Sequence, residues 1–406
     1  MIKPREISRL YSSVPRGMAA NLLRLNVIKF SKWFTLVMPV IVPFYKANGL
    51  SLSEIMVLKS VYSVVIVVLE LPSGYFADVF GRKKTLATGA FLGAAGFVIY
   101  SLTHGYIGFL VAEIALGAGQ SFISGADSAI LYDTLAAGRR EKEYSKYEGV
   151  NTSVGNFSEA FAGLAGGALA LISLRMPFYV QVVIASSAIP AALTLKEPGK
   201  RTKSKSRIKL QDIAGVLSKV LIKEKNLRYN LLFSSIIGAT TLIMAWFVQP
   251  FFEEIGVKLV FYGILWTGLN ITVGISSIGA HKVEKRLGET RTLTLIAVAT
   301  PMLMVVTGIL PLSFVLPLLF IFYVLRGIAT PVLKDYVNQS TSPEVRATVM
   351  SLRDLIIRII FAFLAPVGGW ISDNHGLSEG IIITGAVIAV LSITTLAMFL
   401  KHNNKS

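Results

Sequence analysis

The chain has 406 residues, of which 53% are hydrophobic and 16% are charged, and its mean hydropathy is +0.63. A soluble core of this size does not hide so large an apolar fraction, whereas a bilayer covers it. The formal net charge of +17 would suggest a nucleic-acid partner in a soluble protein, but in a membrane protein it predicts basic cytoplasmic loops and no nucleic acid. The absence of cysteine excludes disulfides and thiolate catalysis.

Twelve apolar runs are long enough to cross a bilayer as helices of roughly 20 residues each. They fall into two groups of six: 26–46, 53–78, 83–103, 106–134, 146–173 and 176–195, then 228–252, 257–281, 291–310, 312–338, 346–371 and 378–400. The pattern predicts an all-α polytopic membrane protein with one six-helix bundle over 1–195 and another over 228–406.

A basic segment, 196–227, separates the two groups. Its first part, EPGKRTKSKSRIK, has the composition of a disordered linker. From Leu210 to Lys223 the apolar residues recur at helical spacing, which predicts an amphipathic helix on the anionic cytoplasmic leaflet.

The positions of the 40 Lys and Arg residues predict the orientation. If the amino terminus is cytoplasmic, nearly all of these cations lie in cytoplasmic segments. The exceptions are Lys46, Lys59, Arg175 and Lys258 on the other side, and Arg326 and Arg358 within spans. The positive-inside rule therefore predicts that both termini are cytoplasmic, and residues 1–24 read as a cytoplasmic arm without a cleavable signal.

The loop after the second run reads GYFADVFGRKKTL over 74–86. It resembles the signature G-x-x-x-D-x-x-G-R-[RK] between the second and third helices of the major facilitator superfamily. Gly74, Asp78, Gly81, Arg82 and Lys83 fill its fixed positions. The resemblance implies a secondary transporter of twelve helices in two pseudo-symmetric bundles. The equivalent loop of the second half is degenerate, because Lys285 stands where Asp78 does in the first.

In that family the loop is part of a gate. The resemblance implies that Asp78 meets the start of the eleventh helix near residues 343–346, where the helix end favours negative charge. It also implies that Arg82 reaches Asp127 or Asp133 at the end of the fourth helix. The alternative is that Arg82 and Lys83 only keep the loop on the cytoplasmic side of the membrane.

Glu113 lies well inside the fourth span, where an ionisable group is costly and faces a cavity or a partner by default. It stands before Gly117 and Gly119 at a position where the family often has arginine. A buried carboxylate there could exchange a proton and attract a cationic group. The alternative is a hydrogen bond to a neighbouring helix.

Two more charged residues are candidates for the same cavity. Arg326 in the tenth span is either a substrate-binding or charge-balancing partner of Glu113, or a structural residue bonded to carbonyls freed by Pro331. Glu159 in the fifth span is a second proton site. It precedes the small residues 162–167, which are similar in part to a signature of drug/proton antiporters and are equally explained by close helix packing.

Glu70 on the second helix and Arg358 on the eleventh lie at similar depths. An ion pair between them would be a latch that exists in only one conformation. The alternative pairs Arg358 with Asp354, four residues earlier on its own helix.

Trp246, Gln249 and Asn270, on the seventh and eighth spans, could complete a substrate pocket. The alternative is that tryptophans near span ends anchor the protein at the membrane interface.

No phosphate loop, HExxH or Gly-x-Ser-x-Gly motif occurs in the sequence, so it predicts neither an ATP-driven pump nor an enzyme, and no cofactor or metal site. We favour a monomeric, proton-coupled exporter of small amphipathic or cationic compounds in the cell membrane, working by alternating access. One alternative is an importer of a small nutrient or metabolite, which would be anionic if Arg326 and Arg358 hold it. Another is a receptor or assembly factor that transports nothing. The sequence does not identify the substrate.

Overall fold

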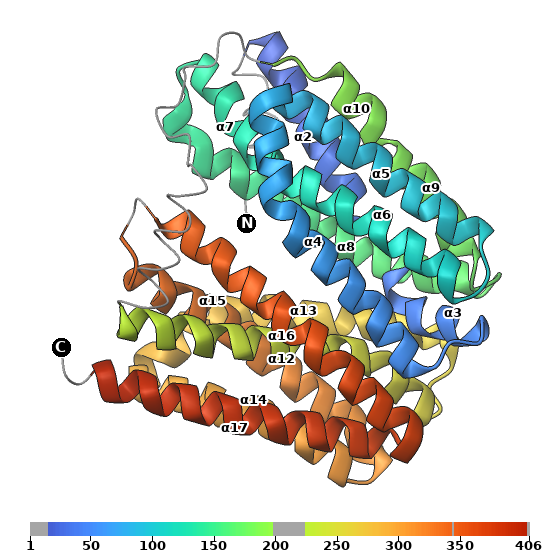
Figure 1. Ribbon diagram of the computed structural model, residues 1–406, viewed down its shortest axis with the longest axis vertical. Helices are drawn as coiled ribbons and strands as arrows, with labels where there is room; N and C mark the ends of the chain where they lie inside the picture. The colour runs from blue at the N-terminus through green and yellow to red at the C-terminus, as the bar shows by residue number, and fades with distance from the viewer. Residues whose placement is uncertain (1–14, 198–223, 343–344, 404–406) are drawn as a thin grey trace. The chain divides into compact units, whose positions relative to one another are not determined.

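The structure is a computed structural model that describes residues 15–197, 224–342 and 345–403. All regular secondary structure in these residues is helical, which confirms the predicted all-α class (Figure 1). The predicted amphipathic helix from Leu210 to Lys223, most of the linker and most of the cytoplasmic arm lie outside the described residues.

The first half of the chain contains nine α-helices in its described part. They are α2 (Arg16–Trp33), α3 (Ile41–Ala47), α4 (Leu52–Phe80), α5 (Arg82–Leu102), α6 (Tyr106–Ser124), α7 (Asp127–Ala137), α8 (Tyr144–Ala170), α9 (Met176–Ser186) and α10 (Ala188–Thr194).

The second half has six longer helices among the described residues. They are α12 (Lys225–Glu254), α13 (Tyr262–Leu287), α14 (Glu289–Ile309), α15 (Val315–Gln339), α16 (Arg346–His375) and α17 (Leu377–Asn403).

Eleven helical segments of the described chain are long and apolar enough to cross a membrane. The remaining predicted span is α8, which has 27 residues but carries polar side chains in its first half, among them Lys146, Glu148 and Asn151. A helix thus lies at the position of each of the twelve predicted spans, and eleven of them are apolar enough to cross a membrane.

The first predicted span is broken between α2 and α3. Such a break frees backbone amides from their helical partners, and in a membrane each of these needs another acceptor. The amide of Leu36 donates to the Gln181 Oε1 atom of α9 at 2.8 Å, and Gln181 is fully buried. A side chain from the sixth predicted span therefore stabilises the break in the first.

The helices form two compact units. The described residues within Met1–Phe44 and Val64–Lys203 form one, and those within Tyr45–Ser63 and Ser204–Ser406 form the other. The segment Tyr45–Ser63, with the start of α4, belongs to the unit of the carboxyl-terminal helices. The bundle bounds 1–195 and 228–406 stay predictions. Within the units, α5 lies along α6, and α14 lies along α17 (Figure 1).

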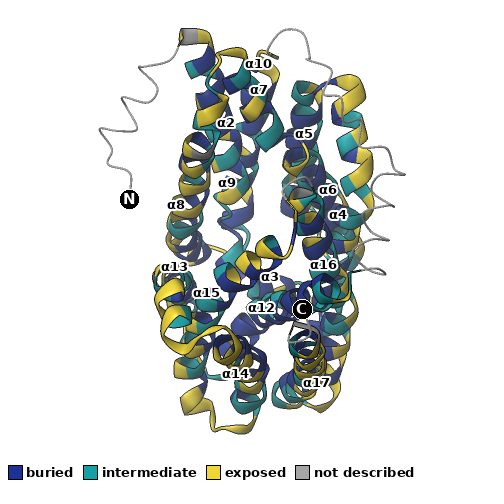
Figure 2. Cartoon of the chain, turned by 90° about the vertical axis from the view of Figure 1, so that its left-hand side faces the viewer, coloured by how far each residue is buried: buried dark blue, intermediate teal, exposed yellow. Residues whose placement is uncertain are grey.

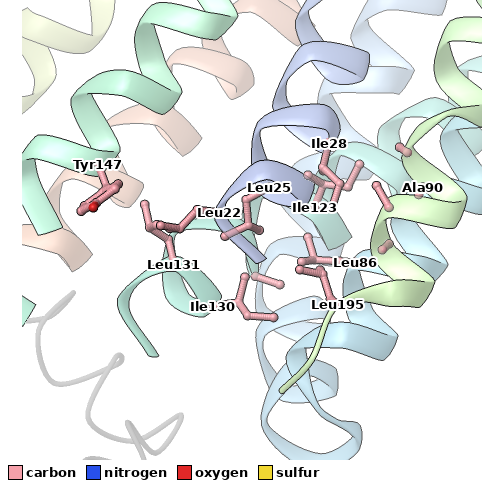
Figure 3. Packing of buried hydrophobic residues seen from close by; sticks show 14 of the residues in the cluster. Leu22, Leu25, Ile28, Leu86, Ala90, Ile123, Ile130, Leu131, Tyr147 and Leu195 are labelled. Carbon is pink, nitrogen blue, oxygen red and sulfur yellow. The ribbon is translucent and has the colours of Figure 1, made fainter. Parts of the chain in front are cut away.

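A buried apolar cluster holds one end of the first unit together (Figure 3). Leu22, Leu25 and Ile28 follow one face of α2 at a spacing of three residues. They pack in a cluster that includes Leu86 of α5 and Ile130 of α7. This cluster adjoins the loop motif and fixes the helices that carry its charged residues.

Many large apolar side chains are exposed, and Figure 2 shows exposed residues along α8 and α13. On α13 the isoleucines Ile264, Ile271, Ile275 and Ile278 are all at least half exposed and recur at helical spacing. A continuous apolar stripe of this kind fits a lipid-facing surface.

Candidate functional site

The loop motif connects α4 to α5 in one residue, Gly81. Its φ of +101° lies in the left-handed region that favours glycine. A Cβ atom at this position would lie 2.5 Å from the Glu197 Oε1 atom, and the amide of Lys83 donates to that oxygen at 2.9 Å. Glu197, for which the sequence predicted no role, thus caps the start of α5. Gly74 has open space around it, so packing does not explain that glycine.

Arg82 binds α7. Its guanidinium forms an ion pair with Asp133 and donates a hydrogen bond to the backbone oxygen of Ala129. Of the two predicted partners, the structure therefore pairs Arg82 with Asp133. The contact fixes the motif to the helix that continues the fourth predicted span.

Asp127 lies in a different group of charges. Its Oδ2 atom is 3.7 Å from the Lys29 Nζ atom and 3.9 Å from that of Lys32, both on α2. Ser128 donates its amide to Asp127 at 2.7 Å, and its hydroxyl lies 3.5 Å from the Glu148 Oε1 atom of α8. The sequence predicted no role for these lysines or for Glu148. The signal available was a pair of lysines three residues apart in an apolar run.

Asp78 is exposed at the end of α4. Its predicted partner, the start of α16, belongs to the other unit and adjoins residues 343–344, which lie outside the described chain. The contact of Asp78 with the eleventh helix stays a prediction. The Glu70–Arg358 latch would likewise join the two units and stays a prediction.

Glu113 is only 1% exposed and lies among aromatic side chains. The hydroxyl of Tyr100 on α5 donates to its carboxylate. The Tyr100 ring lies 5.4 Å from those of Phe109 on α6 and Phe178 on α9, measured between centroids. The hydrogen bond to a neighbouring helix that was the alternative for Glu113 is therefore present, and the carboxyl group is held in an apolar environment.

Glu159 is half-buried on α8. The small residues that follow it allow close packing, because a Cβ atom on Gly166 would lie 1.9 Å from the backbone oxygen of Leu36. That contact explains at least one glycine of the partial antiporter signature by packing alone.

The predicted pocket residues of the second half have varied surroundings. Trp246 contacts the ammonium of Lys59, whose Nζ atom is 4.8 Å from the ring centroid, and Gln249 is 2% exposed. The side-chain amide of Asn270 donates to a backbone oxygen of its own helix at 3.0 Å, which is a local structural bond. The Arg326 guanidinium lies 5.2 Å from the Tyr323 ring, a local cation–π contact.

Arg353 is a buried cation for which the sequence predicted no role. It is 4% exposed, and its Nε atom donates to the Ser234 Oγ atom at 2.6 Å. Its second partner is Asp354 at 3.3 Å, the residue that the alternative interpretation assigned to Arg358. Arg353 thus ties α16 to α12 within the second unit.

The start of α4 is held by α16, and α3 before it is held by α12. Asp373 accepts hydrogen bonds from the amides of Leu52 at 2.9 Å and Ser53 at 2.8 Å. Lys46 forms an ion pair with Glu253 at 2.6 Å. A cavity of about 290 Å³ is bordered by Lys46, Leu52, Glu253 and Asp373. No sequence pattern indicates these contacts, since the partners lie far apart along the chain.

Two units of membrane-length helices, with ionisable side chains buried inside them and the loop motif on α4 and α5, define a multi-pass membrane transport protein. In the described residues no group of three or more His, Asp or Glu side chains is placed to hold a metal ion. The family model described as Major Facilitator Superfamily matches residues 31–359. The chain therefore belongs to this family of transporters, and it is not an enzyme.

Among curated relatives, the chain is similar to the Multidrug efflux protein YfmO of Bacillus subtilis (strain 168), with 26% identity over 372 residues, which are 86% of this chain and 85% of that protein. It is 30% identical over 164 residues to Multidrug resistance protein 2 of the same organism, which covers 40% of each chain. An uncharacterized MFS-type transporter of Methanocaldococcus jannaschii is 22% identical over 46% of this chain and 48% of its own length. The latter two matches thus span half or less of those relatives.

Solved structures agree with the fold. The nucleoside transporter NupG has a TM-score of 0.75 and 15% identity, covering 93% of this chain and 99% of that one. The D-xylose-proton symporter has a TM-score of 0.73 and 13% identity, covering 94% and 97%. At these identities the likeness concerns the fold alone.

Proposed function

We propose that this transporter is a proton-coupled exporter of small amphipathic or cationic compounds, located in the cell membrane with both termini in the cytoplasm. The observation that carries the proposal is the environment of Glu113, a buried carboxyl group among aromatic rings. The similarity to a relative named for multidrug efflux over 86% of the chain supports the direction of transport.

The chemistry of Glu113 suits proton exchange. A carboxylate is far more costly to bury in an apolar environment than the neutral acid. The hydroxyl of Tyr100 donates a hydrogen bond to the carboxyl oxygen. A buried acid whose surroundings differ between two conformations is the kind of group that proton coupling requires.

The loop motif supplies the conformational element of the proposal. Arg82 couples α5 to α7 through Asp133, and Asp78 lies exposed at the end of α4, where the family resemblance implies a contact with the start of the eleventh helix. Alternating access requires contacts that exist in one state and break in the other.

The proposal is tested with purified protein in liposomes that carry a pH gradient. Glu113→Gln removes the titration and keeps the size and hydrogen-bonding capacity of the side chain, so we expect gradient-driven transport of a lipophilic cation to be lost while gradient-independent exchange persists. Tyr100→Phe is the matched control, because it removes the hydrogen bond and keeps the acid, and it should retain driven transport. Undiminished driven transport by Glu113→Gln would refute the proton role.

The sign of the same flux separates export from import. Extrusion of the cation against its gradient when protons flow in the opposite direction supports the exporter. Co-movement of protons with an anionic solute would instead support the importer.

The gate contact is tested by charge reversal. Arg82→Asp and Asp133→Arg should each lower the transport rate, and the double variant should recover part of the loss because the ion pair forms again with reversed charges. Lys84→Asp, at an exposed position of the same loop, controls for net charge. A double variant no better than the single ones would contradict the gating role of this pair.

A further inference from the structure

Lys59 is a buried cation of the second unit that the proposed function does not use. It lies on α4, is 6% exposed, and its ammonium is 5.1 Å from the centroid of the Tyr45 ring and 4.8 Å from that of Trp246. Lys59 is about two turns from the start of α4, and Trp246 is about two turns from the end of α12, so both lie roughly 10 Å from the helix ends. A lysine is almost never buried in this way without partners.

The two rings form part of an aromatic cage. They come from different segments, since Tyr45 is on α3 and Trp246 on α12, and their faces meet at one ammonium group. Aromatic faces arranged in this way bind ammonium and quaternary ammonium groups, with tryptophan the strongest of them. Tyr45 is fully buried, so this face of the cage is held in place by the packing of the protein itself.

We propose that Tyr45 and Trp246 form a cation-binding subsite, that the Lys59 ammonium fills this subsite in the substrate-free protein, and that a cationic substrate displaces it. The subsite takes lipophilic cations such as quaternary ammonium and phosphonium compounds. That the cation is a transported substrate rests on the proposed function, whereas the presence of the subsite does not.

Lys59 and the ligand exclude each other on electrostatic grounds. Two cations that shared these rings would lie within a few ångströms of one another in a medium of low dielectric constant, where their repulsion is strong. The lysine side chain has a flexible four-carbon stem and a strongly hydrated ammonium, so it can leave the rings by rotation about its own bonds. A hydrophobic cation loses less hydration than the ammonium when it takes that place.

Displacement of Lys59 also has a mechanical consequence. The segment Tyr45–Ser63 is tied to α12 and α16 by the Lys59 contact, by the Lys46–Glu253 ion pair and by the two amides bound to Asp373. A cation that replaces Lys59 on Trp246 removes one of these ties. Binding at the subsite therefore loosens the start of α4.

The test measures binding of radiolabelled tetraphenylphosphonium to the full-length protein in lipid nanodiscs. Lys59→Ala vacates the rings, so its dissociation constant should be at least about ten-fold lower than that of the wild type, which is roughly 1.4 kcal/mol. Lys59→Arg keeps a cation on the rings and should bind no more tightly than the wild type. Trp246→Leu introduced into the Lys59→Ala protein should abolish the gain.

Lys59→Gln also removes the ammonium from the two rings but keeps a polar side chain. It replaces Lys59→Ala in the experiment if the alanine variant does not fold. Folding is checked by size-exclusion chromatography and by thermal unfolding. A folded Lys59→Ala or Lys59→Gln protein with wild-type affinity would overturn the proposal, as would a gain that survives the loss of Trp246.

These results are independent of those for Glu113. A gain in binding that depends on Trp246, found in a protein without proton-driven transport, would support the subsite and refute the exporter. Proton-driven export by the wild type, with no gain in the Lys59 variants, would refute the subsite and leave the exporter intact.

Discussion

The cap on α4 allows a quantitative prediction. Asp373 uses one carboxylate oxygen for the amide of Leu52 and the other for the amide of Ser53, at 2.9 and 2.8 Å. Both are charge-assisted hydrogen bonds to a helix amino terminus, where negative charge is also favoured by the helix dipole. Asp373→Asn keeps one acceptor oxygen but places an NH₂ group against the second amide.

The expected cost follows from these two bonds. Loss of a helix cap destabilises the helix start by about 0.5–2 kcal/mol, and loss of the charge places Asp373→Asn in the upper part of that range. An opening free energy lower by about 1–2 kcal/mol makes local opening roughly 5–30 times more frequent. The amides at the start of α4 should therefore exchange with deuterium faster by about that factor.

Hydrogen–deuterium exchange measured by mass spectrometry on a peptide that spans residues 50–56 tests the prediction directly. Asn374→Ala is the matched control, because Asn374 is exposed on the same helix and donates to a backbone oxygen of that helix. Exchange changed less than about two-fold in Asp373→Asn, or changed equally in the control, would refute the assignment of Asp373 as the cap.

Three further predictions concern packing and charge. Gly166→Ala should lower the melting temperature in detergent, because the new Cβ atom would lie 1.9 Å from a backbone oxygen. Overpacking of this kind typically costs about 1–3 kcal/mol or more. Gly149→Ala is the control, because the space around Gly149 is open and the substitution should be tolerated. Arg353→Met should lower the free energy of unfolding by about 1.5–3 kcal/mol, since it removes a charged hydrogen bond to a buried serine; thermal melting that matches the wild type would contradict this. The hydrogen bond from Arg140 lowers the pKa of Glu143 below its ordinary value of 4.5, so this ion pair stabilises the fold above that pH and the effect is lost as the pH falls through the lowered pKa. Glu143→Gln should therefore lower the melting temperature slightly near neutral pH and not at a pH of about 3. Because the ion pair is largely exposed, the loss of unfolding free energy near neutral pH should stay within about 1 kcal/mol.

The sequence was sufficient to predict the helical class and eleven of the twelve predicted spans. Hydropathy is a local property, since a run of about 20 apolar residues crosses a bilayer whatever surrounds it. The exception is α8, which is long enough to cross a bilayer but carries polar residues such as Glu148 and is not among the eleven segments that are apolar enough. The loop motif from Gly74 to Lys83 could also be recognised from the sequence, because all its residues lie in one short stretch between two helices.

Side-chain partners were harder to predict. Two acids, Asp127 and Asp133, lay within reach of Arg82 by sequence, and only the fold pairs Arg82 with Asp133 and places Asp127 beside Lys29 and Lys32. Periodicity shows which face of a helix is apolar, but it does not show which neighbouring helix covers that face.

The contacts around α4 show most clearly which contacts the sequence does not predict. Asp373 and the amide of Leu52 are 321 residues apart in the chain, and the sequence contains no local pattern that joins them. The same holds for Lys59 and Trp246, whose cation–π contact exists only because α4 and α12 meet. Local hydropathy indicated that this chain crosses a membrane, and a short loop motif indicated its family. The packing of helices, a property of the whole chain, decided which buried charges have partners and where a cation can bind.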